Sequence, residues 1–409
     1  MKVKRNEGQT RLSWKRRIVF YCAACAAAFL VLELCFRVFF AFYVGPSVLL
    51  YGTPLAREHV QPALAPRQVE REAKTYMFKM SQEEWNKRRS VEIHPNELRG
   101  YSKYYPNQKR VDFDVDTGEL FDVTINSHGF RGRDFAEQKD PGVIRVICLG
   151  ASSTFGYFDR DDETYPVYLE QFLNERFAGK QKFEVINFGI PHLPSWQIYS
   201  LFVAEGLPLK PDIVTYYEGN NDSDPPQRWL NLSLAHAAIK KLGRYLVTAK
   251  FVDSIASKFL RQSLSEKAVA DISNNYIHQV SKIYEECRKR GILFIAANQQ
   301  RNSQAFDRAE LKTMTYQQEV AKIQEKLQNS GALIHPELAL LIHSVLMKRL
   351  KIWTEKNRVP FVDVIGRLDH DRDVLVSWVH LSAKGNRMVA NALADKISEL
   401  KPWAVKEKN

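Results

Sequence analysis

The pattern of apolar and polar positions changes sharply near residue 45. Residues 18–32 hold no charged side chain, and a second apolar run follows Glu33 and Arg37 as far as residue 44. A helix over 18–44 would be about 40 Å long, enough to cross a bilayer with some tilt. Glu33 and Arg37 are four residues apart, so they share one helix face and can form an ion pair. The pattern predicts one transmembrane helix.

Two other interpretations of this run are an amphipathic or core helix and a cleaved signal peptide. Cleavage is disfavoured because the apolar stretch continues past Arg37 without a small-residue cleavage site before a polar start. Residues 1–17 hold seven Lys or Arg and one Glu, half of the net charge of +12. Such a basic tail stays in the cytoplasm, which predicts a single-pass protein with its remainder on the far side of the membrane. The charge therefore indicates topology, and no nucleic-acid partner is expected.

After the helix, the chain falls into three predicted parts. Residues 45–97, rich in Arg, Glu, Gln and Pro, indicate a partly helical juxtamembrane stalk, and 98–140 a small β-rich segment with a hairpin within 110–130. Residues 141–409 alternate strand and helix patterns, which predicts an α/β three-layer sandwich with a mainly parallel sheet. The five predicted strands cover residues 143–150, 183–189, 213–219, 292–298 and 359–365. An apolar helical insertion, 223–273, is either a lid, a partner-docking element or a packed excursion without a special task.

Three residues whose side chains could take part in catalysis follow the strand patterns. Ser152 comes directly after the first strand, Asn221 after the third, and His380 in the last segment. Ligands of such folds bind beyond the carboxyl ends of the strands. A serine nucleophile needs a base, and the oxyanion that forms needs donors. Together these residues predict nucleophilic chemistry without a metal or organic cofactor.

The spacing of these residues resembles the SGNH, or GDSL-like, hydrolase superfamily, over about residues 121–400. Gly-x-Ser ends at Ser152, Gly-x-Asn-Asp contains Asn221, and His-Leu-Ser-x-x-Gly-Asn begins at His380. The resemblance implies an SGNH-hydrolase, flavodoxin-like fold with Ser152 as nucleophile, His380 as base and Asn221 as oxyanion donor. The run 125–135 looks like the branch of this family that is anchored in the bacterial inner membrane, with its domain in the periplasm, and modifies envelope polysaccharides.

Two positions depart from the family pattern. His192 stands where the family usually has a glycine whose backbone N–H faces the oxyanion. We expect the oxyanion hole to use the backbone N–H groups of His192 and Ser152, and we expect the larger side chain to make the hole narrower. Ser377 replaces the aspartate three residues before His380. That aspartate normally orients the imidazole, and its loss should lower the rate unless a neighbouring carboxylate or a backbone carbonyl replaces it. The nearby carboxylates are Asp369, Asp371 and Asp373.

The resulting expectation is a membrane-anchored serine esterase, deacetylase or O-acyltransferase that acts on an acylated envelope glycan, with a membrane acyltransferase as a partner. The alternative is a catalytically impaired relative that serves as a glycan-binding or assembly subunit of a polysaccharide-modification complex. Outside the predicted span the only cysteines are Cys148 and Cys287, without CxxC spacing or a histidine cluster. We expect both to be buried free thiols, with no zinc site.

Overall fold

The computed structural model describes residues 14–44, 49, 77–79, 100–224, 238, 242–243, 246–252 and 265–401. The chain divides into two compact units. One contains residues 1–69 and 232–259, and the other contains residues 70–231 and 260–409. The cytoplasmic tail predicted for residues 1–17 lies largely outside the described residues, as does most of the predicted stalk.

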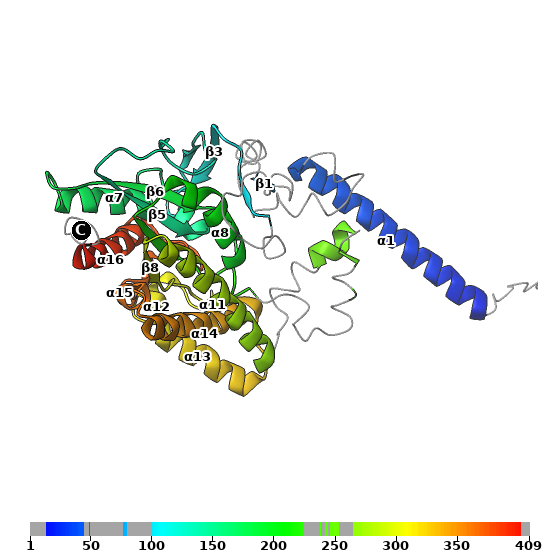
Figure 1. Cartoon of the computed structure of the whole chain (residues 1–409). Coiled ribbons are helices and arrows are strands. Elements are labelled where there is room, and N and C mark those ends of the chain that lie inside the picture. The colour runs from blue at the N-terminus through cyan, green and yellow to red at the C-terminus, as the bar shows by residue number, and fades with distance from the viewer. Residues whose placement is uncertain are drawn as a thin grey trace, which may run out of the picture. The chain divides into compact units, whose positions relative to one another are not determined.

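The first unit is dominated by helix α1 (Trp14–Val44), the long blue helix of Figure 1. Residues Arg16–Phe39 have a mean hydropathy of 2.3, and most of their side chains are exposed. In the part of the chain that the structure describes, α1 is the one helix long and apolar enough to cross a membrane, a property that signal sequences share. The helix is thus compatible with either a single-pass anchor or a signal sequence.

Glu33, the single acidic residue of α1, has a complete set of partners within this unit. The predicted ion pair is present, with Arg37 Nε 2.8 Å from Glu33 Oε1. The carboxylate also accepts the backbone N–H groups of Val247 and Thr248 at 2.9 Å each, and the Thr248 hydroxyl. A piece of the predicted insertion therefore contacts α1, and it does so through the free N–H groups of a helical turn.

The second unit is built on a five-stranded sheet in the order β6-β5-β7-β8-β9, with every neighbouring pair parallel. The strands are β5 (Val143–Gly150), β6 (Lys182–Gly189), β7 (Ile213–Tyr217), β8 (Leu293–Ala297) and β9 (Phe361–Val362). All eight residues of the central strand β5 are buried, as expected for a parallel strand covered on both faces. The sheet confirms the predicted α/β fold class.

Helices cover both faces of this sheet. On one face, alternate residues of β5 such as Val146 and Cys148 pack against α7 (Tyr165–Arg176), α15 (Val364–Leu368) and α16 (Ala383–Leu400). The opposite layer contains α8 (Ser195–Leu201), α11 (Glu266–Lys289) and α14 (His335–Asn357), which Figure 1 labels. The shorter or peripheral elements are α6 (Ser152–Phe155), η2 (Phe202–Gly206), η3 (Leu207–Leu209), α12 (Arg308–Lys312), α13 (Tyr316–Ser330) and η5 (Arg372–Val374).

Two small antiparallel pairs precede the sheet. Strand β1 (Met77–Lys79) pairs with β2 (Ser102–Tyr104), and β3 (Gln108–Phe113) pairs with β4 (Leu120–Ile125). The second pair is the hairpin that the alternating pattern within residues 110–130 predicts.

Some predicted boundaries were wrong. The fifth strand was expected over residues 359–365, but β9 has two residues, because the Asp363 side chain accepts the Gly366 N–H and starts α15. Helix α11 begins at Glu266, inside the range expected for the insertion, where the Ser265 hydroxyl caps it. Helix α13 was not predicted, although Thr315 and Gln318 form a capping box at its start.

Candidate active site

The serine of the site follows the central strand of the sheet. Strand β5 ends at Gly150, and Ser152 is the first residue of α6, with 8% of its surface exposed. A Cβ atom at position 150 would lie 1.9 Å from Thr154 Oγ1 and 2.6 Å from the Tyr217 carbonyl oxygen. Only glycine therefore lets the turn after β5 pack against the end of β7, and this close packing fixes the position of Ser152.

The structure brings His380 into contact with Ser152 although the two are 228 residues apart. His380 Nε2 lies 2.8 Å from Ser152 Oγ, and His380 is 5% exposed. His380 lies in the loop just before α16, and the aromatic rings of Tyr157, Phe158 and Trp378 surround its imidazole with centroid distances of 5.3, 5.4 and 5.7 Å. The predicted nucleophile and the predicted base thus lie in contact, and both side chains are largely shielded from solvent.

The second nitrogen of the imidazole contacts Ser377, at the position where the family pattern has aspartate. Ser377 Oγ lies 2.7 Å from His380 Nδ1. The three nearby carboxylates that could have replaced the aspartate are engaged elsewhere: Asp369 accepts the Tyr316 N–H, Asp371 pairs with Lys384, and Asp373 pairs with Lys312. The group that orients His380 is therefore a hydroxyl, an outcome that the sequence analysis did not consider.

This hydroxyl favours one tautomer of His380. Ser377 Oγ also accepts the backbone N–H groups of His380 at 3.0 Å and Val379 at 3.3 Å. A hydroxyl has two lone pairs and one proton, so an oxygen that accepts two N–H groups has only its O–H to offer Nδ1. The imidazole proton then lies on Nε2, where it donates to Ser152 instead of accepting its proton. The base-competent tautomer requires Ser377 to release the longer Val379 bond and accept Nδ1–H.

The electrostatics of the site keep His380 uncharged. Burial, together with the nearby positive charges of His192 and Arg110, lowers the pKa of His380 to about 3. The imidazole is neutral at pH 7, as a base must be, but its charged form gains no stabilisation from a carboxylate partner. His380 is thus uncharged and only weakly basic, and the tautomer described above still has to change before Nε2 can accept a proton.

The predicted oxyanion residues lie at the ends of β6 and β7, which flank β5. Asn221 Nδ2 donates to the Leu193 carbonyl at 3.0 Å, which ties the Asn-Asp turn to the His192 loop and leaves a second amide hydrogen. His192 adopts φ = +66°, the left-handed conformation that glycine adopts most readily. The backbone thus retains the glycine-like turn despite the substitution. Loss of hydration and the charge of Arg110 lower the pKa of His192.

A polar loop after β8 supports the histidine and was not singled out from the sequence. The Asn302 N–H donates to the Trp378 carbonyl at 2.8 Å, and Asn302 Nδ2 donates to the Ser377 carbonyl at 2.9 Å. Gln299 Nε2 donates to Ser153 Oγ at 3.0 Å, and Ser153 donates to the Val379 carbonyl. The available signal was the polar run 298–302 directly after an apolar strand.

In the part of the chain that the structure describes, no group of three or more His, Cys, Asp or Glu side chains is arranged to hold a metal ion. Cys148 and Cys287 are buried and free, as predicted. Burial raises the pKa of the Cys148 thiol to about 12 and raises that of Cys287 as well, so neither is a thiolate at neutral pH.

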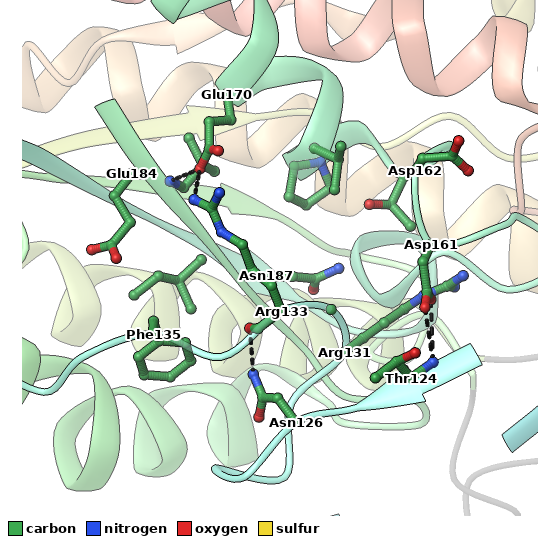
Figure 2. A pocket seen from close by; sticks show the side chains of 16 residues that line it. Thr124, Asn126, Arg131, Arg133, Phe135, Asp161, Asp162, Glu170, Glu184 and Asn187 are labelled. Atoms are coloured by element: carbon green, nitrogen blue, oxygen red, sulfur yellow. Dashed lines mark hydrogen bonds and ion pairs between the residues drawn. The ribbon is translucent and has the colours of Figure 1, made fainter. Parts of the chain in front are cut away.

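A cavity of about 410 Å³ lies away from Ser152 and His380, beside β4, α7 and β6 (Figure 2). Its walls carry several charges that pair with one another, including Arg133 with Glu170 and Arg131 with Asp161. Asn187, near the end of β6, also lines it, and its side chain accepts the Gly189 N–H. The cavity contains neither Ser152 nor His380, so the proposed chemistry does not involve it.

The parallel sheet order, the serine after its central strand and the histidine before its last helix agree with the resemblance seen in the motifs. The chain has an SGNH-like hydrolase fold. No family model matches the chain, and no curated protein matches it.

The solved structures that resemble this chain share little sequence identity with it. They include a putative lipolytic protein of the G-D-S-L family from Desulfitobacterium hafniense (13% identity, 62% of this chain and 98% of that chain, TM-score 0.37). An aryl esterase from M. smegmatis has 15% identity over 63% of this chain and 99% of its own, with a TM-score of 0.39. A carbohydrate acetylesterase from Sinorhizobium meliloti has 13% identity over 63% and 99%, also with a TM-score of 0.39.

Proposed function

We propose that the protein is a serine-dependent ester hydrolase or O-acyltransferase whose substrate is an acylated glycan. The observation that carries this proposal is the 2.8 Å contact between Ser152 Oγ and His380 Nε2 in a nearly buried crevice. Such a pair, held by glycine-dependent packing on one side and a hydrogen-bonded loop on the other, is suited to acyl transfer.

The reaction has two halves. Ser152 Oγ attacks the ester carbonyl while its proton moves to His380 Nε2, and the oxyanion that forms is stabilised by N–H donors of Ser152, His192 and Asn221. Collapse releases the alcohol, which takes the proton from His380, and leaves an acyl group on Ser152. Water then gives hydrolysis, whereas a sugar hydroxyl gives transfer. In either case His380 removes the proton of the acceptor and returns it to Ser152 Oγ as the bond between the acyl group and the serine breaks.

The proposed setting is the outer face of a bacterial inner membrane, with α1 as the anchor and the SGNH-like domain in the periplasm. The apolar length of α1 and the basic residues before it support this topology. A membrane acyltransferase as a partner would supply the acyl group if the reaction is a transfer.

A second candidate function is a binding or assembly subunit of the same modification system. The specific observation in its favour is the contact between Ser377 and His380, which favours the tautomer that cannot take a proton from Ser152. In that case the crevice would hold the acylated sugar without cleaving it.

The experiment that separates the two uses the full chain purified in detergent, with an aryl acetate and acetylated sugars as substrates. We expect slow hydrolysis that Ser152→Ala abolishes. Ser281→Ala, which removes a half-buried hydroxyl of α11 that donates to the His278 carbonyl within the helix, is the matched control and should leave the rate unchanged. A rate that persists in Ser152→Ala would refute the serine mechanism, and binding without turnover of any ester would support the second candidate.

A further inference from the structure

Arg110, on β3 of the small hairpin, contacts Tyr157, one of the aromatic side chains that surround His380. Its guanidinium carbon is 4.3 Å from the centre of the Tyr157 ring, and that ring centre is 5.3 Å from the centre of the His380 ring. The guanidinium and the imidazole are therefore no more than 9.6 Å apart. Consistent with this proximity, the charge of Arg110 lowers the pKa of both His380 and His192.

The guanidinium of Arg110 has unused donors although it is 7% exposed. Its hydrogen bonds leave from Nη1, which donates to the hydroxyls of Tyr104 at 2.6 Å and Tyr157 at 2.7 Å. The buried Nε–H has no partner among the described residues. Ser152 is similarly enclosed, with 8% of its surface exposed.

Arg110 also lacks a counter-ion. Among the residues that the structure describes, no carboxylate lies within 4.0 Å of its guanidinium nitrogens. Asp112 is the acidic neighbour on the same strand, but its oxygens accept the backbone N–H groups of Phe113 at 3.0 Å and Phe158 at 3.2 Å. Two neutral tyrosine hydroxyls thus remain as the hydrogen-bond partners of a side chain that does not lose its charge.

A buried charge without a counter-ion is unfavourable, and a substrate anion would remove that cost. The donors that remain are Nε–H and those of Nη2, which lie along one edge of the planar guanidinium. Two parallel donors on such an edge match the two oxygens of a carboxylate.

We propose that Arg110 binds a carboxylate of the substrate, so that the preferred substrate of the Ser152 site is an acylated glycan that contains uronic acid. This inference rests on the proposed esterase or transferase function. The limit of 9.6 Å between the guanidinium and His380 allows the carboxylate and the reacting ester to lie on one sugar or on adjacent sugars.

The first test uses the unchanged full chain in detergent and three acetyl esters: an acetylated uronate, its neutral carboxyl methyl ester, and an acetylated sugar sulfate. We expect kcat/KM for the uronate to exceed that of the neutral ester by roughly tenfold or more, since a charge-assisted bidentate pair is lost in the neutral compound. Equal values would overturn the inference, and a preference for the sulfate would overturn the assignment to a carboxylate.

The second test changes Arg110 itself. Arg110→Gln should lower kcat/KM for the acetylated uronate by roughly 30-fold, and this fall should be at least about tenfold larger than the fall for an aryl acetate. Lys109→Gln makes the same change of net charge at an exposed position on the same strand and should not alter the preference.

An equal fall on both substrates would show that Arg110 merely shapes the crevice, and would overturn the inference. The aryl acetate also separates the two proposals. If the unchanged protein hydrolyses aryl acetate without preferring uronates, the esterase function stands and this inference fails. If it neither hydrolyses an ester nor transfers its acyl group to a sugar, the proposed function itself fails.

Discussion

Ser152 is positioned mainly by backbone packing in the central sheet, whereas His380 lies in a loop that is positioned by side-chain hydrogen bonds. The strand before Ser152 is hydrogen-bonded on both sides, and Gly150 brings it against the neighbouring carbonyl of Tyr217. The loop before His380 depends on a polar contact from Asn302 and on the hydroxyl of Ser377. The proposed nucleophile is thus held mainly by the sheet, and we expect the reaction rate to depend most on the proposed base.

The largest effect is expected at the histidine. A carboxylate has enough lone pairs to accept the two backbone N–H groups and also Nδ1–H, which Ser377 cannot do. Ser377→Asp should therefore favour the base-competent tautomer, stabilise the imidazolium and raise kcat by about 10²-fold or more. Ser377→Asn, similar in size but neutral, is the control. Steady-state kinetics in which the two variants were equally fast would contradict this account.

At the serine, the expected effect is on stability. Gly150→Ala should lower the free energy of unfolding by about 2–3 kcal/mol, because the new methyl group meets the Tyr217 carbonyl, which the sheet holds in place. Gly219→Ala, at the end of the adjacent strand, meets the movable methyl group of Met347 and should cost clearly less. Denaturant unfolding of the two variants measures the difference, and equal losses would argue against a rigid serine turn.

The hydrogen bond from Asn302 to the loop that contains His380 can be removed separately. Asn302→Ala removes the side-chain bond to the Ser377 carbonyl and should lower kcat about tenfold, with a stability loss of about 1 kcal/mol. Asn174→Ala removes side-chain bonds to the Glu170 and Phe183 backbone far from the site, and should cost stability while leaving kcat intact. Kinetics and unfolding measured on both variants would contradict the prediction if Asn174→Ala slowed the reaction as much.

The smallest effect concerns pH. Burial raises the pKa of Glu218 from 4.5 to about 8, so the folded protein holds a proton that the unfolded chain releases above pH 4.5. Stability should therefore fall as pH rises through this window, by about 1 kcal/mol between pH 6.5 and 8. Glu218→Gln should remove that slope. The Asp222 pKa of about 6 lies below this window. His380 offsets part of the fall, because its pKa is about 3 in the folded protein whereas the unfolded chain still releases that proton near pH 6.5, and this offset is the same in Glu218→Gln.

Unfolding curves at pH 6.5 and 8 test this prediction. A slope that survives in Glu218→Gln would show that Glu218 is charged in the folded protein.

Much of the fold could be predicted because its signals are local. Strand β5 was predicted with its observed ends, since a run of seven residues, six of them apolar, before a glycine indicates a buried parallel strand. Strand β9 was predicted too long because Asp363 supplies a helix cap inside an apolar run, and capping competes with strand formation there.

The sequence by itself determined the α/β fold class, the apolar N-terminal helix and the identity of Ser152 and His380, because motif spacing and hydrophobic periodicity depend on neighbours in the chain. Only the tertiary structure decided which group orients His380 and that Arg110 lies close to it. Those facts depend on contacts between segments far apart in sequence, such as β3, the turn after β5 and the loop before α16. Such contacts arise from packing, which no local pattern records.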